Sequence, residues 1–268
     1  MKGRPNRTSG KKNRSVLVPK LRRFTHEGRL RSAHQISARI VEKYGSDVMA
    51  VYVYGSTSKK LDRPYSDLEM IVAVRDRAEI PMKSYLHRGL IINIEYLRSS
   101  NVLDAAAQFT KDWHWEADQY RNRIDLYERD GWFTKLDRAV EKNDKADSAE
   151  AIRKSFMMMI ESIAFMRNAR LTKNKIGVLS SGRVVAEDAA RIVFLLNRRY
   201  VTTTSWFWKI LFGLRNKPKD FKELVEKMCG FVPTSAEEVV ASSERLYKEM
   251  DELVTHSGVK IESDDLWV

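Results

Sequence analysis

The chain has 268 residues, 43% hydrophobic and 31% charged, with a formal net charge of +12 at pH 7. This length and apolar content exclude intrinsic disorder and fibrous classes, and they suit one large domain or two small ones. The apolar stretches fall short of the ~18–20 residues that a membrane span needs, and the single cysteine, Cys229, excludes a disulfide framework or a cysteine-rich zinc site. Because the basic N-terminus has no apolar signal core, we expect an intracellular, cytoplasmic protein.

Positive charge is concentrated at the N-terminus. Residues 1–31 contain eleven Lys and Arg against one acid, Glu27, whereas the other 237 residues contain 37 bases and 35 acids. The net charge therefore divides into +10 on this segment and +2 on the remainder. We interpret residues 1–28 as a basic, flexible tail. Such a tail either contacts nucleic acid through counterion release or is a solvated leader with no ligand.

The predicted elements change type along the chain. A helix is expected over Ala33–Tyr44, where apolar residues recur with helical spacing and Gly45 follows as a stop. Three short, β-branched segments predict strands, and these are Val48–Tyr54, Leu68–Val74 and Leu90–Leu97. From about Asn101 the pattern is mostly helical, and its clearest helices are Ser148–Arg170, Arg183–Asn197 and Ser235–Ser257.

This order of elements predicts an α+β fold. A small mixed β-sheet with helices is expected over residues 29–128, followed by a helical bundle over residues 129–268. The last helix has a capping-box signature, Ser235 followed by Glu238.

Candidate metal ligands open the second predicted strand. The segment Tyr54–Met70 reads YGSTSKKLDRPYSDLEM. Residues two apart share a face of a strand, so Asp67 and Glu69 present two carboxylates side by side while Leu68 and Met70 turn to the core. Two carboxylates at this spacing suit Mg²⁺, because substrate phosphates supply further ligands. An isolated D-x-E pair is more often solvated surface.

A phosphate-binding turn precedes this pair. Gly55 and Ser56 follow a hydrophobic strand, so their backbone amides can approach a phosphate closely, and Ser56, Lys59 and Lys60 add side-chain donors. Phosphate donors and metal ligands are thus expected in one corner.

A third acid lies on the third predicted strand. Asn93 and Glu95 share a face there, opposite to Ile92 and Ile94. Glu95 either completes a three-carboxylate metal cluster or is an edge-strand charge that discourages aggregation.

The hydrophobic strand, G-S turn and D-x-E pair resemble the nucleotidyltransferase superfamily of the polymerase-β type. The match is closer to the kanamycin nucleotidyltransferase family of aminoglycoside O-nucleotidyltransferases. It extends over about residues 33–268 and is carried by VYGS, PYSDLEM, KYGSDV, the Arg167-Asn168 pair and RYVTTT at Arg199–Thr204. The resemblance implies a Mg²⁺-dependent homodimer, with the site at the subunit boundary, that uses an NTP, with ATP favoured, as co-substrate.

Glu161 has two readings on residues alone. It lies in a nearly apolar stretch, FMMMIESIAFM, so we expect a largely buried environment or the cleft between domains. Such a carboxylate is either a general base or the partner of Arg153 or Arg167 in a structural salt bridge. The resemblance favours the base, because that family has a catalytic Glu seven residues before the Asn of an Arg-Asn pair, as Glu161 is before Asn168.

One departure puts the acceptor in question. The family has a ligand-contacting Lys one turn after the base, where this chain has Phe165, and Arg167 or Arg170 is the alternative for that contact. A cationic acceptor also needs acids, which a second cluster supplies. The local acids are Asp112, Glu116 and Asp118, beside Trp113 and Trp115, which either stack a ring or belong to the core.

We therefore expect transfer of a nucleoside monophosphate, AMP from ATP, to a hydroxyl of an aminoglycoside-like small molecule, with release of pyrophosphate. The expected site residues are Asp67, Glu69 and Glu95 for metal, Gly55, Ser56 and Lys59 for nucleotide, and Glu161 for catalysis. Two alternatives remain: the same chemistry on an RNA or protein hydroxyl, or a catalytically silent nucleic-acid-binding or antitoxin-like module.

Overall fold

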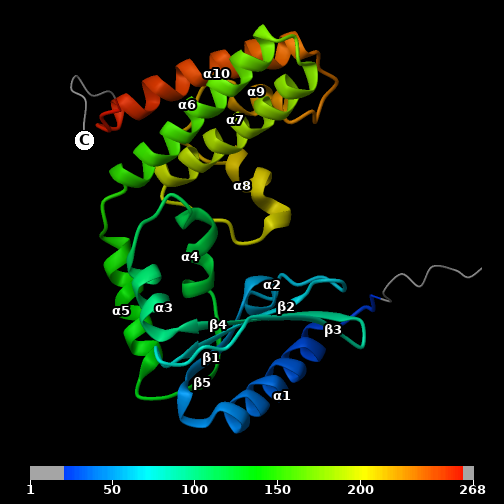
Figure 1. The fold of residues 1–268 in the computed structure, drawn as a ribbon, viewed down its shortest axis with the longest axis vertical. Helices are drawn as coiled ribbons and strands as arrows, with labels where there is room; N and C mark the ends of the chain where they lie inside the picture. Colours follow the sequence, from blue (N-terminus) through cyan, green and yellow to red (C-terminus); the bar gives the residue numbers. More distant parts are fainter. Residues whose placement is uncertain (1–20, 262–268) are drawn as a thin grey trace, which may run out of the picture.

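The computed structural model describes residues 21–261, in a half built on a β-sheet and a half built of helices (Figure 1). Most of the predicted basic tail lies outside these residues, but residues 26–28 form the start of a helix rather than tail. The elements of the sheet half are α1 (His26–Tyr44), η1 (Gly45–Asp47), β1 (Val48–Tyr54), α2 (Gly55–Ser58), β2 (Leu68–Val74), β3 (Lys83–His87), β4 (Leu90–Arg98), α3 (Ser99–Ala107), α4 (Trp113–Arg121), β5 (Ile124–Glu128) and α5 (Trp132–Asp144).

The regular elements described between residues 149 and 261 are all helices. They are α6 (Ala149–Leu171), α7 (Lys175–Leu196), η2 (Thr204–Trp206), α8 (Phe207–Phe212), α9 (Phe221–Met228) and α10 (Ala236–His256). The predicted α+β class, with a mixed sheet followed by a helical region, is confirmed. Of the helices between residues 21 and 261, none is both long and apolar enough to cross a bilayer.

The sheet has five strands in the order β3-β4-β2-β1-β5. Only β2 and β4 pair in parallel, and the other neighbours are antiparallel. The central strands β1 and β2 are almost wholly buried, which is why their apolar, β-branched runs were predictable. The short strands β3 and β5 were not predicted, because they lie at the sheet edges and are mostly exposed or half-buried.

Helices cover both faces of the sheet. On one face, α1 buries Ala33 and Ile40 against β1, β2 and β4. On the other face, α3 and α5 pack against the sheet, and Trp132 of α5 stacks on Tyr52 of β1 with 6.2 Å between ring centroids. The boundary predicted after residue 128 falls between β5 and α5, and this packing adds α5 to the sheet half.

Capping explains where two helices begin earlier than the apolar periodicity predicts. At the start of α1, the Thr25 hydroxyl accepts a hydrogen bond from the Gly28 amide at 3.1 Å. At the start of α7, Asn174 Oδ1 accepts from the Gly177 amide at 2.9 Å. Each polar cap accepts a hydrogen bond from an amide that has no partner within the helix. The helix can therefore begin in a polar, solvent-exposed segment before its apolar periodicity starts.

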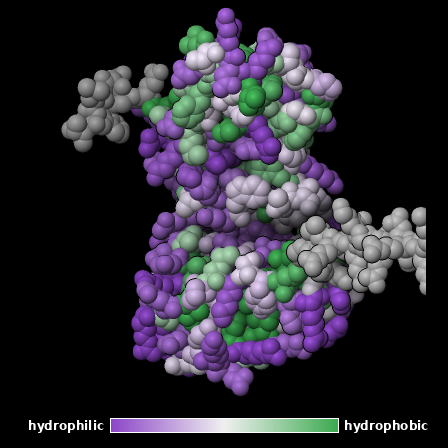
Figure 2. Space-filling model, turned by 45° about the vertical axis from the view of Figure 1, so that its right-hand side comes forward, coloured by the Kyte–Doolittle hydropathy of each residue, from purple (hydrophilic) through white to green (hydrophobic). Residues whose placement is uncertain are grey.

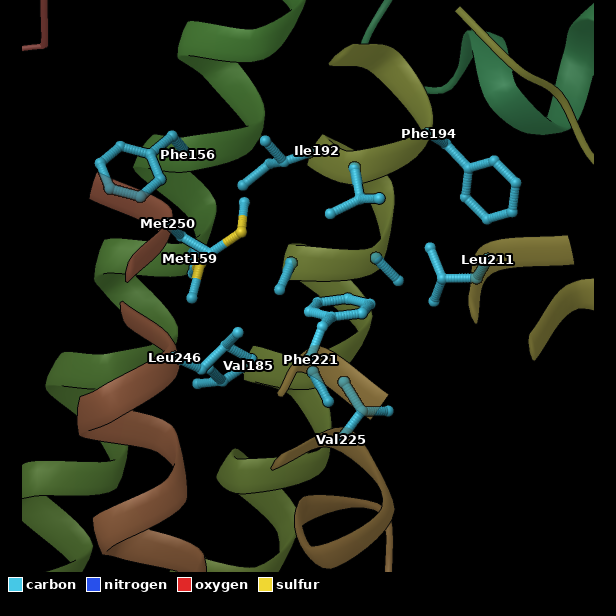
Figure 3. Close-up of a cluster of buried hydrophobic side chains, with 14 of the residues drawn as sticks. Phe156, Met159, Val185, Ile192, Phe194, Leu211, Phe221, Val225, Leu246 and Met250 are labelled. Carbon is cyan, nitrogen blue, oxygen red and sulfur yellow. The ribbon is translucent and has the colours of Figure 1, made fainter. Parts of the chain in front are cut away.

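The core of the helical half is formed where α6, α7, α9 and α10 meet (Figure 3). Phe156 and Met159 of α6 face Leu246 and Met250 of α10, and all four side chains are 0% exposed. Burying each such side chain contributes about 1.5–3 kcal/mol to folding. The predicted capping box of α10 is present: Ser235 Oγ accepts from the Glu238 amide at 3.2 Å, and Glu238 Oε2 accepts from the Ser235 amide at 2.8 Å.

Candidate functional site

A cavity of about 410 Å³ lies between the two halves. It opens where β1 ends and β2 begins, and it faces α4 and the loop that follows α7. Figure 2 shows the surface narrowing between the helical half and the sheet half. Four of the predicted site residues line the cavity, and these are Gly55, Ser56, Asp67 and Glu69.

The two predicted metal ligands share one face of the strand edge. Leu68 and Met70, which alternate with them, are 0% exposed in the sheet core. The pKa of Glu69 is raised to about 7, mainly by burial and next by the negative charge of Asp67. The pair is therefore a half-buried concentration of negative charge that a bound cation would relieve.

Glycine at position 55 suits both the backbone conformation and the crowding of this turn. Its φ of +71° is in the left-handed region, and a Cβ built on it would lie 1.8 Å from Glu69 Oε2. The backbone of the turn and the Glu69 carboxylate are thus in direct contact. This close approach brings backbone amides of the predicted phosphate turn beside the carboxylate pair.

Lys59, the remaining predicted nucleotide-binding residue, does not line the cavity, and its ammonium is held by protein groups. Its Nζ donates to the Asp118 carboxylate of α4 and to the Gly55 carbonyl. The Lys59 and Asp118 side chains are only 10% and 9% exposed. Asp118, which we predicted as part of an acidic cluster for a cationic acceptor, is therefore already paired with a base.

Glu95 and Asn93 occupy different positions relative to the carboxylate pair. In the parallel β2–β4 register Asn93 lies beside Glu69, and Glu95 lies two residues farther along, beside Ile71. Asn93 Nδ2 donates to Asp67 Oδ2 at 3.0 Å, whereas Glu95 Oε1 accepts from the Tyr54 hydroxyl at 2.8 Å. Metal ligation by Glu95 stays a prediction.

Two carboxylates are enough to hold a divalent cation at this position. In the part of the chain that the structure describes, no three His, Cys, Asp or Glu side chains are grouped to hold a metal. Mg²⁺ needs only one or two protein carboxylates when substrate phosphates bind it as well. Asp67 and Glu69 meet that requirement.

Glu161 is not at this cavity. It is exposed on α6, so the predicted largely buried environment is wrong: Met159, Ile163 and Met166 turn inward on the other side of the helix, whereas Met157 and Phe165 are exposed as Glu161 is. The predicted salt-bridge partners are also engaged elsewhere, since Arg153 binds Glu150 and Arg167 binds Glu244. Glu161 thus presents its carboxylate to the surface.

The two tryptophans of α4 differ in environment. Trp113 is 5% exposed and donates from Nε1 to Asn143 Oδ1 at 2.7 Å, so it belongs to the core. Trp115 is 43% exposed and lines the candidate cavity together with Gln119 and the hydroxyl-rich segment 202–205. These groups were not predicted as site residues, although the Trp115 alternative and the RYVTTT motif pointed toward them.

His114 makes the stability of this region sensitive to pH. The side chain is buried on α4 against Phe194, and burial lowers its pKa to about 3. In the unfolded chain the histidine has a pKa near 6.5, so it is protonated at a pH where the folded chain keeps it neutral. Stability therefore falls as pH drops below about 6.5. We expect this group alone to lower the free energy of unfolding by about 2 kcal/mol between pH 7 and pH 5.

Urea unfolding at pH 7 and pH 5 gives the change in free energy of unfolding between the two pH values. This change should be smaller in His114→Leu than in the native protein, and the difference measures the effect of His114. The exposed His34→Leu variant is the matched control and should keep the native pH dependence. An unchanged pH dependence in His114→Leu would contradict the assignment.

Known proteins resemble the chain over most of its length. Residues 130–260 match the family model of the KNTase C-terminal domain. The aminoglycoside nucleotidyltransferase (4') of Staphylococcus aureus is 24% identical over 240 residues, covering 88% of this chain and 93% of the relative. The protein of the same name from a Bacillus species is 23% identical over 236 residues, with the same coverage.

The fold has a relative among solved structures. A nucleotidyltransferase-like protein from Exiguobacterium sibiricum superposes with a TM-score of 0.54 at 15% identity. The match covers 87% of this chain and 81% of that protein. It shows a shared fold.

Proposed function

We propose that this chain, which is similar to aminoglycoside nucleotidyltransferases and to the KNTase C-terminal domain, is a nucleotidyltransferase that transfers a nucleoside monophosphate from an NTP to a hydroxyl of an aminoglycoside. The observation that carries the proposal is the Asp67–Glu69 pair in contact with the Gly55 turn inside one cavity. The names of the 23–24% identical relatives support the acceptor class. AMP from ATP is the donor group we favour.

The chain's own groups have separable tasks in this reaction. Backbone amides at Gly55 and Ser56 would bind the triphosphate, and the Lys59 ammonium, held by Asp118 and the Gly55 carbonyl, would add positive charge behind the turn. Mg²⁺ on Asp67 and Glu69 would offset the negative charge of the phosphates. The acceptor oxygen forms a bond to the α-phosphorus while the bond from that phosphorus to the bridging oxygen breaks, and pyrophosphate leaves. The acceptor proton passes to Glu161.

In a homodimer, Glu161 of one subunit could reach the cavity of the other subunit, although it does not line the cavity of its own chain. Met157, Glu161 and Phe165 are spaced four residues apart on α6, so they form one surface ridge, and the two apolar members are 37% and 64% exposed. Apolar side chains of this size on a helix face are typical of a subunit contact. We infer that this ridge meets the cavity of a second copy and delivers Glu161 to it.

Pyrophosphate release tests the proposed function. The native protein is assayed with ATP, GTP, CTP or UTP and Mg²⁺, with kanamycin or total RNA as parallel acceptors. Release that depends on kanamycin supports the proposal. Release that depends on RNA alone would replace the acceptor class and implicate the basic segment before residue 21, and silence with every acceptor would favour a binding module.

Glu161→Gln tests the base and the dimer together. We expect nucleotide binding to persist and kanamycin-dependent turnover to fall by about 10²–10⁴-fold, because a positioned general base contributes that much. Mixing Glu161→Gln with Asp67→Asn chains, each inactive alone, should restore part of the activity, since a mixed dimer contains one intact site. Near-native turnover in Glu161→Gln would show that another group takes the proton, and failed complementation would contradict a site shared between subunits.

A further inference from the structure

We infer that Trp115 is the platform on which the donor's nucleobase stacks, an inference that rests on the proposed function and specifies one half of its site. The candidate cavity has two chemically different ends. Gly55, Ser56 and the Asp67–Glu69 pair form the phosphate and metal end. The other end presents a flat aromatic ring, a side-chain amide and several hydroxyls, which belong to Trp115, Gln119 and residues 202–205.

The indole ring is held flat by an aromatic stack behind it. Phe207 lies parallel to Trp115, with 5.0 Å between ring centroids and 8° between planes, and Phe194 in turn contacts Phe207 at 5.2 Å. Phe207 is only 9% exposed, whereas Trp115 keeps 43% of its surface accessible. One face of the indole is therefore covered by the core and the other is available to a planar ligand.

The charges around Trp115 favour a base over a ring of the cationic acceptor. Among the acids that line the cavity, Asp118 is nearest in sequence to Trp115, and its carboxylate is already bound to Lys59. The remaining acids of the cavity lining, Asp67 and Glu69, belong to the phosphate end. A polycation would thus find no unpaired carboxylate at the Trp115 end, while a neutral base finds a stacking surface.

The polar groups at this end predict the order in which nucleotides with different bases bind. Gln119 offers both a donor and an acceptor, and the hydroxyls of Thr202, Thr203 and Thr204 can do either. Such groups adapt to any base edge, so they discriminate weakly between adenine and guanine. Stacking scales with ring area, so purine nucleotides should bind more tightly than pyrimidine nucleotides.

Titration calorimetry with Mg²⁺ and the α,β-methylene analogues of ATP and CTP tests this assignment without turnover. Trp115→Leu should weaken the ATP analogue about tenfold or more and the CTP analogue less, since stacking on an aromatic side chain is lost. Trp115→Phe keeps a ring against Phe207 and should recover most of the affinity. Trp206→Leu is the matched control, because Trp206 directly follows the lining segment 202–205 but does not itself line the cavity.

Inorganic tripolyphosphate separates base binding from phosphate binding. Its affinity should be the same in the native protein and in Trp115→Leu, because it has no base. Equal loss of tripolyphosphate and ATP-analogue binding would overturn the assignment, as would unchanged ATP-analogue binding or a selective loss of kanamycin binding. If the native protein binds no nucleotide analogue, the proposed function itself fails, which is a separate outcome.

Discussion

Asp67→Asn is expected to lower Mg²⁺-dependent pyrophosphate release by about 10²–10³-fold. The substitution removes one carboxylate of the Asp67–Glu69 pair, which lines the cavity beside Gly55. Charge stabilisation by a bound metal is worth several kcal/mol, and each 1.36 kcal/mol is a factor of ten in rate. The side chain keeps its size, so the hydrogen bond with Asn93 can be replaced and the strand should stay in register.

Two further measurements make the Asp67 result specific. Binding of Mn²⁺, followed by electron paramagnetic resonance in the presence of a nucleotide, should weaken in parallel with the rate. Asp104→Asn removes the same charge from an exposed position on α3 and should leave both quantities unchanged. If Asp67→Asn releases pyrophosphate at nearly the native rate with normal Mn²⁺ binding, the carboxylate pair is not the metal site.

Prediction of the fold succeeded where burial leaves a strong local pattern. The strands Val48–Tyr54 and Leu68–Val74 were predicted to the residue, because both lie at the centre of the sheet and are apolar on both faces. Lys83–His87 has almost no buried side chain, so its sequence carries no alternation to detect. It forms a strand because β4 supplies its hydrogen bonds, and a pairing partner cannot be seen in a local window.

Prediction of the site succeeded within one segment and weakened across segments. Gly55, Ser56, Asp67 and Glu69 follow from strand alternation and a turn, which are local. The Lys59–Asp118 pair joins residues 59 positions apart, and no periodicity reveals it. The β4 residue beside Glu69 likewise depends on register, which places Asn93 there and Glu95 two residues farther along. Helical spacing placed Glu161 correctly on a helix but could not say which face meets solvent.

A buried ion pair holds the loop that leads into Asp67. Arg29 of α1 and Asp62 have side chains that are 1% and 2% exposed, with Arg29 Nη1 and Asp62 Oδ2 2.8 Å apart. The same guanidinium donates to the Ser66 carbonyl from Nε at 3.0 Å and to the Arg63 carbonyl from Nη2 at 2.6 Å. Ser66 directly precedes Asp67, so α1 fixes the backbone from which the candidate metal ligand projects.

Arg29→Met should therefore destabilise the protein by about 3–5 kcal/mol, because the buried Asp62 carboxylate loses its guanidinium partner and keeps only the hydrogen bond with the His26 imidazole, and because two carbonyls of the loop are freed. Urea unfolding measures the loss. The exposed Arg31→Met on the same helix should change stability by no more than about 0.5 kcal/mol. Combining Arg29→Met with Asp62→Leu should recover part of the lost stability, since the double variant no longer buries the Asp62 carboxylate without its guanidinium partner. A double variant as unstable as the sum of the two single variants would show instead that the guanidinium acts through the loop carbonyls.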